Sequence, residues 1–168
     1  MSADRPICVL IGALGGQGGG VLADWLVEAA EHAGYPAQAT STPGVAQRTG
    51  ATTYYYELFP EKNPPGDPVF TLFPATGDLD IMAALEPTEA GRAVERGFVT
   101  ATTTVITGLE RVYSTAEKMP AGDGRIETDP MMDMLENVSK DLIRLNVKEL
   151  SDGTASRINA VMFGAIIG

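Results

Sequence analysis

The chain has 168 residues, which is the length of one ordinary domain and too short for two. It is 44% hydrophobic and 20% charged, as in a folded globular protein, and its apolar runs are too short to span a bilayer. A net charge of -10 opposes binding to nucleic acid or to an anionic membrane, and one Cys with one His excludes the usual zinc, haem and iron–sulfur ligand sets within the chain.

The N-terminal part predicts a strand, a glycine loop and a helix. Residues 7–11 form a continuous apolar run, which is typical of a parallel strand buried on both faces. Five glycines follow within residues 15–20, and from Val21 apolar residues recur at helical spacing until Gly34 ends the pattern. The apolar run at the start is shorter than the core of a secretion signal, so we expect a cytoplasmic protein.

The middle of the chain predicts several short strands. Residues 60–68 contain four prolines, so this segment is expected to be a loop that pairs with no strand. The residues around it are rich in Thr, Tyr, Val and Ile, which favour strands. We expect strands over 36–42, 52–59, 69–73, 80–84 and 98–107, a hairpin strand over 111–114, and a helix over 87–96.

Two helices are expected in the last part of the chain. Asp129-Pro130 is typical of a helix start, and one apolar stripe continues from there through Met131, Met134, Leu135, Val138, Leu142 and Leu145. The final apolar run, residues 160–168, predicts a helix that is hydrophobic on all sides and must be covered. We therefore expect residues 1–168 to be a single domain of a longer polypeptide.

Strands that alternate with helices predict an α/β fold. We expect a Rossmann-like three-layer domain with a mostly parallel sheet, which is partly mixed because the middle strands follow one another without a helix between them.

The glycine loop is the first candidate site. Between a buried strand and a helix, unpaired backbone N–H groups and the helix dipole favour a phosphate or carboxylate. Gly18, Gly20 and Ala23 match the letters of a dinucleotide motif, but residues 38–41 lack the acidic residue that such a site requires. No Lys-Ser or Lys-Thr follows the loop as in a Walker A motif. The alternative is a tight turn that packs against its neighbours.

Residues 42–50, Thr-Pro-Gly-Val-Ala-Gln-Arg-Thr-Gly, are the second candidate. They follow a predicted strand at the end where α/β sheets bind ligands, and they lie close to the glycine loop if the two strands are neighbours. The guanidinium of Arg48 suits a carboxylate or phosphate, whereas the alternative is a surface arginine paired with a local acid. No set of residues predicts a catalytic triad, and we assign no catalytic residue.

Both motifs resemble the gamma domain of the 2-oxoacid:ferredoxin oxidoreductases, the pyruvate/ketoisovalerate oxidoreductase gamma type. Within that family, the likeness is closest to the N-terminal domain of the long bacterial indolepyruvate ferredoxin oxidoreductase beta subunit. The chain departs from the family pattern at Ala13 and Thr49, where many gamma domains have glycine. The resemblance continues through residues 78–80, 89–92, 111–113, 116–118, 122–125 and 159–164.

The resemblance implies a complex that oxidatively decarboxylates aryl 2-oxoacids such as indolepyruvate to acyl-CoA and passes electrons to ferredoxin. In that family thiamine diphosphate and the iron–sulfur clusters belong to other domains or to the partner subunit, so we expect this domain to be inactive alone. Gamma domains are associated with coenzyme A binding and with closing over the active site. The residues expected to face the intersubunit cleft and hold coenzyme A are Gly15, Gly16, Gln17, Gly18, Gly19, Thr42, Gly44, Gln47, Arg48 and Thr49.

Two other functions stay open at this point. The chain could be a domain of an NAD(P)- or FAD-dependent oxidoreductase with a modified glycine loop. It could also be a non-catalytic interaction module, in which the glycine loop meets the backbone of a partner protein.

Overall fold

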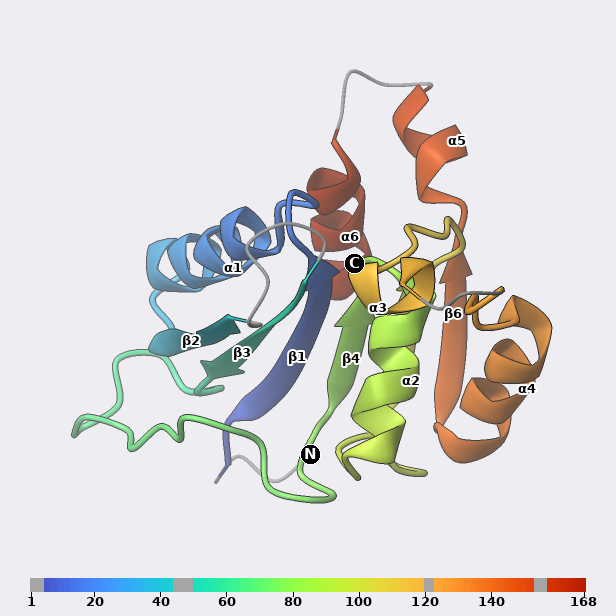
Figure 1. Ribbon diagram of the computed structural model, residues 1–168. Coiled ribbons are helices and arrows are strands. Elements are labelled where there is room, and N and C mark those ends of the chain that lie inside the picture. Colours follow the sequence, from blue (N-terminus) through green and yellow to red (C-terminus); the bar gives the residue numbers. More distant parts are fainter. Residues whose placement is uncertain (1–4, 44–49, 120–122, 153–156) are drawn as a thin grey trace.

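A six-stranded mixed sheet runs through the centre of the molecule (Figure 1). The computed structural model describes residues 5–43, 50–119, 123–152 and 157–168. The strand order is β2-β3-β1-β4-β5-β6, in which β1, β4, β5 and β6 are parallel and β3 is antiparallel to both β1 and β2. This confirms the predicted mostly parallel, partly mixed sheet. The strands are β1 (Ile7–Leu14), β2 (Ala37–Pro43), β3 (Ala51–Leu58), β4 (Ile81–Ala84), β5 (Thr104–Gly108) and β6 (Asp141–Leu145).

Helices cover both faces of the sheet, as the three-layer prediction requires (Figure 1). On one face lie α1 (Gly19–His32) and α6 (Ile158–Ile167), and on the other lie α2 (Pro87–Glu95) and α4 (Thr128–Val138). Two short helices, α3 (Thr115–Lys118) and α5 (Val147–Asp152), follow β5 and β6. No helix within the described segments is long and apolar enough to cross a membrane.

The central strand β1 is buried on both faces, which explains its continuous apolar sequence. Cys8 and Leu10 pack against the layer of α2 and α4, whereas Val9 and Ile11 pack against the layer of α1 and α6. Because successive side chains of a strand point to opposite faces, such a strand has no solvent-facing positions to mark it as amphipathic.

The apolar helix α6 is covered on one side only, because Met162 is buried whereas Ile167 is 62% exposed. Its Phe163 ring meets the Trp25 ring of α1 edge to face, with 6.1 Å between the ring centroids. Met162 is fully buried in the core between α6 and the sheet. The helix therefore packs this side on α1 and on the central strands.

The strand predicted over 69–73 is wrong. Val69 and Leu72 are 89% and 72% exposed, and side chains of β2 and β3 bind the backbone of this segment. Glu57 accepts a hydrogen bond from the Thr71 N–H at 2.6 Å, and the Thr40 hydroxyl donates to the Leu72 carbonyl at 2.9 Å. Because these bonds occupy its backbone groups, the segment lies across the two strands without joining the sheet.

The hairpin strand predicted over 111–114 is also wrong, and the strand predicted over 98–107 is shorter than expected. Residues 111–114 are irregular because the Arg111 side chain turns inward to Glu86 and Glu117. Before β5, the buried Thr103 hydroxyl donates to the Leu79 carbonyl at 2.9 Å. The chain therefore turns at this point, and the strand begins at Thr104.

The predicted helical stripe continues too far, because α4 ends at Val138 and the next residues form β6. Leu142 and Leu145, which the stripe included, lie on opposite faces of the sheet. Ser139 is extended, and β6 then pairs in parallel with β5. The free edge of β5 determines this strand, and a local pattern does not contain that information.

Candidate functional site

The glycine loop lies at the point where the connections of the sheet change direction. From β1 the chain passes through α1 to β2 on one side, whereas from β4 it passes through α2 to β5 on the other. The two strands are parallel neighbours, so both connections leave the same edge of the sheet. In open α/β sheets, this is where ligands bind.

The N-terminus of α1 is not capped by any side chain. Gly18 is the N-cap residue, it makes no side-chain cap bond, and the first turn contains no acidic residue. The first helical hydrogen bond runs from the Leu22 N–H to the Gly18 carbonyl. Among the described residues, the N–H groups of Gly19, Gly20 and Val21 have no hydrogen-bond partner. Such donors at the positive end of a helix dipole favour an anion.

The glycines of the loop serve different purposes. Gly16 has φ +96°, and no atom lies within 4 Å of the position that a Cβ would take, so it faces open space. A Cβ on Gly19 would lie 2.7 Å from the Ala13 Cβ and 2.8 Å from Cε2 of Tyr54. Gly19 therefore lets α1 pack closely on β1 and β3, whereas Gly16 is exposed to solvent.

Gln17 holds the loop in shape. Its side-chain Oε1 accepts a hydrogen bond from the Leu14 N–H at 2.7 Å, and its own N–H donates to the Leu14 carbonyl at 3.1 Å. This residue was predicted to contact a ligand, and the structure places its amide oxygen inside the loop. The Nε2 group is the part of the side chain left for an external acceptor.

The structure brings the C-terminal end of the second motif next to the glycine loop. The Gly15 N–H donates to the Gly50 carbonyl at 3.1 Å, and Leu14 pairs with Ala51 across β1 and β3. Thr42, near the end of β2, is paired with Thr53 of β3. The remaining predicted residues of this motif, Gly44, Gln47, Arg48 and Thr49, lie outside the described residues.

Asn159 belongs to the same site, although it is far away in the sequence. It is the second residue of α6 and is 5% exposed. Its Nδ2 lies 3.0 Å from the position of a Gly18 Cβ, so the amide packs directly on the loop. The sequence analysis placed this residue in a segment that resembles the family but gave it no role in the site. A polar amide at the start of an otherwise apolar run was the available signal.

The N-terminus of α2, across the crevice, is filled by a carboxylate of the chain itself. Glu86 is the N-cap residue and is fully buried, and it accepts the Thr88 N–H at 2.9 Å. Arg111 donates its Nε–H to Glu86 at 2.6 Å and its Nη1–H to the Ile126 carbonyl at 2.6 Å, and it also pairs with Glu117. One guanidinium therefore joins α2, α3 and the segment that leads into α4.

Glu117 is held in its charged form by this arrangement. Burial by itself raises the pKa of a carboxyl group. For Glu117, hydrogen bonds from the N–H groups of Ser114 and Ile126, from the Ser114 hydroxyl and from Arg111 outweigh burial, and its pKa is lowered below the ordinary value.

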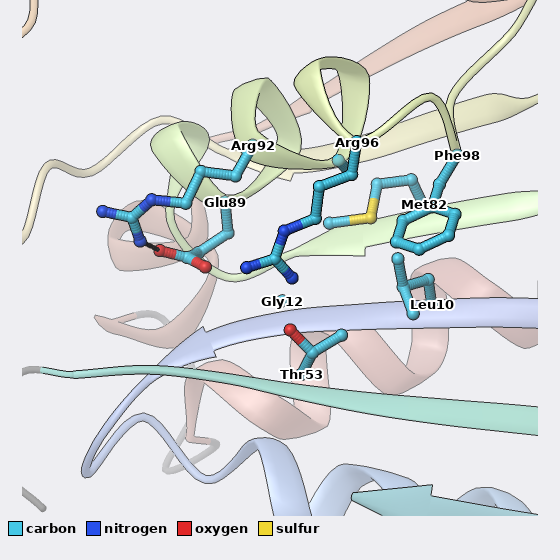
Figure 2. Close-up of a pocket in the computed structure, with 9 residues that line it drawn as sticks. Leu10, Gly12, Thr53, Met82, Glu89, Arg92, Arg96 and Phe98 are labelled. Carbon is cyan, nitrogen blue, oxygen red and sulfur yellow. Dashed lines mark hydrogen bonds and ion pairs between the residues drawn. The ribbon is translucent and has the colours of Figure 1, made fainter. Parts of the chain in front are cut away.

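A narrow crevice lies over Gly12 on the α2 side of the sheet (Figure 2). A Cβ on Gly12 would lie 2.6 Å from the Glu89 Cβ, so glycine is needed for α2 to approach β1. Figure 2 shows Glu89 paired with Arg92, and Arg96 extends over Gly12 toward Thr53. Burial, partly opposed by Arg92, raises the pKa of Glu89 to about 7. Its carboxyl group therefore titrates near neutral pH.

Cysteine and histidine do not form a reactive site in the described part of the chain. The buried Cys8 thiol accepts a hydrogen bond from the Tyr55 hydroxyl at 3.2 Å, and burial raises its pKa. His32 is exposed at the end of α1, beside the Glu28 carbonyl. The described residues contain no cluster of His, Cys, Asp and Glu that could hold a metal ion.

Comparisons with known proteins agree with this architecture. The family model described as pyruvate ferredoxin/flavodoxin oxidoreductase matches residues 8–168. The indolepyruvate oxidoreductase subunit IorB of Archaeoglobus fulgidus is 28% identical over 163 residues, which are 95% of this chain and 75% of that protein.

Solved structures of low sequence identity share the fold. The pyruvate oxidoreductase subunit PORC of Thermotoga maritima has a TM-score of 0.65 at 14% identity, covering 97% of this chain and 75% of that one. The gamma subunit of a keto/oxoacid ferredoxin oxidoreductase from Geobacter sulfurreducens has a TM-score of 0.59 at 16% identity, covering 96% of this chain and 75% of that one. The 2-oxoglutarate:ferredoxin oxidoreductase of Magnetococcus marinus, solved with 2-oxoglutarate, coenzyme A and succinyl-CoA, has a TM-score of 0.59 at 13% identity, covering 94% and 23%.

The family match covers nearly the whole chain, and it agrees with the resemblance of the two motifs and with the observed fold. The chain therefore belongs to the pyruvate ferredoxin/flavodoxin oxidoreductase family, as a gamma-type domain of a 2-oxoacid:ferredoxin oxidoreductase.

Proposed function

We propose that the chain serves an indolepyruvate (aryl 2-oxoacid):ferredoxin oxidoreductase, in which its glycine loop forms part of the coenzyme A and intersubunit cleft. In such a reaction the 2-oxoacid loses carbon dioxide, its acyl group passes to the thiol of coenzyme A, and the electron pair passes to ferredoxin. The similarity to an indolepyruvate oxidoreductase subunit supports the substrate class.

The uncapped N-terminus of α1 is the observation that carries the proposed site. Its N–H groups at Gly19, Gly20 and Val21 have no partner among the described residues, and no acidic residue stands in the first turn. Open space at Gly16 leaves room for a ligand beside these donors. This donor set fits the phosphates of coenzyme A, which in turn supplies the thiol that takes over the acyl group.

The redox groups of the reaction are assigned to other parts of the complex. The described residues contain no cluster of side chains that could hold a metal ion, and the buried Cys8 thiol is bonded by Tyr55. We therefore place thiamine diphosphate and the iron–sulfur clusters in a partner subunit or domain, and the chain by itself is inactive.

Two variants of Gly16 test the coenzyme A site in the purified complex. Asn and Asp have the same size and both tolerate positive φ, so Gly16→Asn and Gly16→Asp differ mainly by one charge. A carboxylate among the donors repels a phosphate, and we expect Gly16→Asp to bind coenzyme A about fivefold more weakly than Gly16→Asn, as measured by calorimetry. If the two variants have equal affinities for coenzyme A, the loop does not bind coenzyme A. The remaining interpretation is then a loop that contacts a partner protein.

The substrate class is tested by the rate of ferredoxin reduction. The complex should oxidise indolepyruvate with a higher kcat/KM than pyruvate or 2-oxoglutarate, with acyl-CoA and carbon dioxide as products. A preference for an aliphatic 2-oxoacid would contradict the aryl assignment and would leave the coenzyme A site untouched. Fluorescence titration with NAD(P)H or FAD tests the alternative oxidoreductase, which predicts tight binding by the chain alone.

The second motif adds a prediction that rests on the sequence. Gln47 and Arg48 are expected to contribute to the same cleft, because Gly50, two residues after Arg48, accepts a hydrogen bond from Gly15 of the glycine loop. Changing Arg48 to Ala in the complex should raise the coenzyme A concentration needed for half-maximal rate. An unchanged requirement would remove Arg48 from the site.

A further inference from the structure

Asn159 presents a polar group that the fold does not use. The residue is 5% exposed, yet among the described residues its side-chain amide donates and accepts no hydrogen bond. The neighbouring positions of α6 are apolar, so packing alone would accept Leu or Met here.

The amide opens toward the glycine loop. No fully enclosed side-chain nitrogen or oxygen in the described part of the chain lacks a partner, so both polar atoms of Asn159 retain access to solvent. The adjacent surface is Gly18, because Nδ2 and Cγ lie 3.0 and 3.2 Å from the position of its missing Cβ. The Asn159 amide therefore lies beside the N-terminus of α1.

We propose that Asn159 is a ligand-binding residue, and that its amide together with the free N–H groups at the start of α1 holds a phosphoryl group. The group takes donors from two helices: backbone N–H groups at Gly19 and Gly20, and the side-chain Nδ2–H of Asn159. The absence of a side chain at Gly18 lets the two sets of donors lie next to each other. That this phosphoryl group belongs to coenzyme A rests on the proposed function.

Charge and donor type favour a phosphoryl group over a base or a sugar. The donors on α1 are all N–H groups, and its first turn contains no acidic acceptor. The positive end of the α1 dipole adds attraction for a dianion. A neutral amide that donates can complete this set, whereas a carboxylate in the same place would repel the ligand.

The test uses the isosteric change Asn159→Asp in the complex, with coenzyme A and inorganic pyrophosphate as separate calorimetric probes. Replacing the donor with a negative charge should lower the affinity for both probes at least about tenfold, because hydrogen bonds to charged groups are strong. Asn137→Asp is the matched control, since Asn137 is exposed on α4 and bonded to the Asp133 carbonyl. It should leave both affinities unchanged.

Asn159→Ala keeps the inference falsifiable if Asn159→Asp fails to fold. This variant removes the donor without adding charge, and we expect it to fold. Its affinities for pyrophosphate and for coenzyme A should fall to a similar degree. A lower affinity for coenzyme A with an unchanged affinity for pyrophosphate would mean that Asn159 contacts a different part of coenzyme A. This result would overturn the phosphoryl assignment.

The Gly16 variants separate the two proposals. If Gly16→Asp lowers the affinity for coenzyme A but both Asn159 variants bind both probes as the wild type does, the role of Asn159 is overturned and the proposed function stands. If the Gly16 and Asn159 variants all bind pyrophosphate weakly while coenzyme A affinity is unchanged, the phosphoryl site stands and its assignment to coenzyme A falls. If all variants bind both probes normally, both proposals fall.

Discussion

The N-termini of α1 and α2 face the same edge of the sheet, but only that of α2 is capped by a side chain. Helix α2 begins with Glu86, a fully buried carboxylate that accepts the Thr88 N–H and pairs with Arg111. Helix α1 begins with Gly18, which offers no side chain, and its first N–H groups have no partner among the described residues. Helix α2 therefore has an anion of the chain at its N-terminus, whereas α1 has none among the described residues.

This difference separates a helix end that stabilises the fold from the helix end at which we propose that an anion binds. A buried carboxylate that is paired and hydrogen-bonded fixes the structure around it, and its removal is costly. A capping side chain in place of an N-cap glycine contributes only a few tenths of a kcal/mol. The chain gives up this contribution at α1, at the place where ligands bind in sheets of this type.

The largest expected effect comes from Arg111→Met. Without the guanidinium, Glu86 is left as an uncompensated buried charge, and we expect the free energy of unfolding to fall by about 3–5 kcal/mol in denaturant titrations at neutral pH. Arg125→Met, which removes an exposed pair with Asp123, is the control and should change stability little. Adding Glu86→Gln to Arg111→Met should recover part of the loss. A loss as small as that of the control would mean that the ionic cluster does not stabilise α2.

The second carboxylate of α2, Glu89, should make stability depend on pH. Its pKa of about 7 lies above the ordinary 4.5, so its protonated form is favoured in the folded state. The stability that this provides is complete below about pH 4.5 and is lost as the pH rises to about 7. Relative to Glu89→Gln, the wild-type free energy of unfolding should fall by on the order of 3 kcal/mol across this range. Glu95→Gln, at the exposed end of the same helix, should show no such difference.

Gly19→Ala tests the packing role at the start of α1. The added methyl group would meet Ala13 and Tyr54 below 3 Å, and we expect a loss of about 1–3 kcal/mol in unfolding free energy. Gly20→Ala is the neighbouring control, because its nearest contact is the Tyr54 hydroxyl at 3.3 Å and alanine favours a helix. If both variants are equally stable, the close approach of α1 to the sheet does not require glycine.

Gln17→Glu should make the end of α1 resemble that of α2. A glutamate can still accept the Leu14 N–H, so the loop keeps its shape, and its charge is favourable near the helix N-terminus. We expect unchanged or slightly higher stability together with about fivefold weaker binding of coenzyme A by the complex. Unchanged affinity in a folded variant would contradict an anion site at this helix end.

Local patterns in the sequence predicted the elements that carry their own signals. The strand, loop and helix at the N-terminus were predicted from signals that follow one another along the chain. These signals are the apolar run of β1, the glycines after it and Gly34 at the end of the helix. Tertiary partners decided the elements that were missed. Leu142 and Leu145 form a strand because the edge of β5 is available, and Arg111 leaves the predicted hairpin because Glu86 is buried nearby.

The site was predicted to a similar extent. The glycine loop and the segment that ends at Gly50 follow from motifs, and the structure joins them through the hydrogen bond from Gly15 to Gly50. The motifs did not distinguish the open Gly16 from the packed Gly19, because that difference depends on Tyr54. They also did not indicate Asn159, because its contact with Gly18 joins residues from opposite ends of the chain.

The position of Asn159 in the last helix has a consequence for a chain that is being made on a ribosome. The glycine loop and α1 emerge early, but the amide that packs on Gly18 follows only after every strand has been synthesised. A nascent or truncated chain thus carries the loop without its partner from α6. The contact between Asn159 and Gly18 therefore forms only after β1 to β6 and the start of α6 have been synthesised.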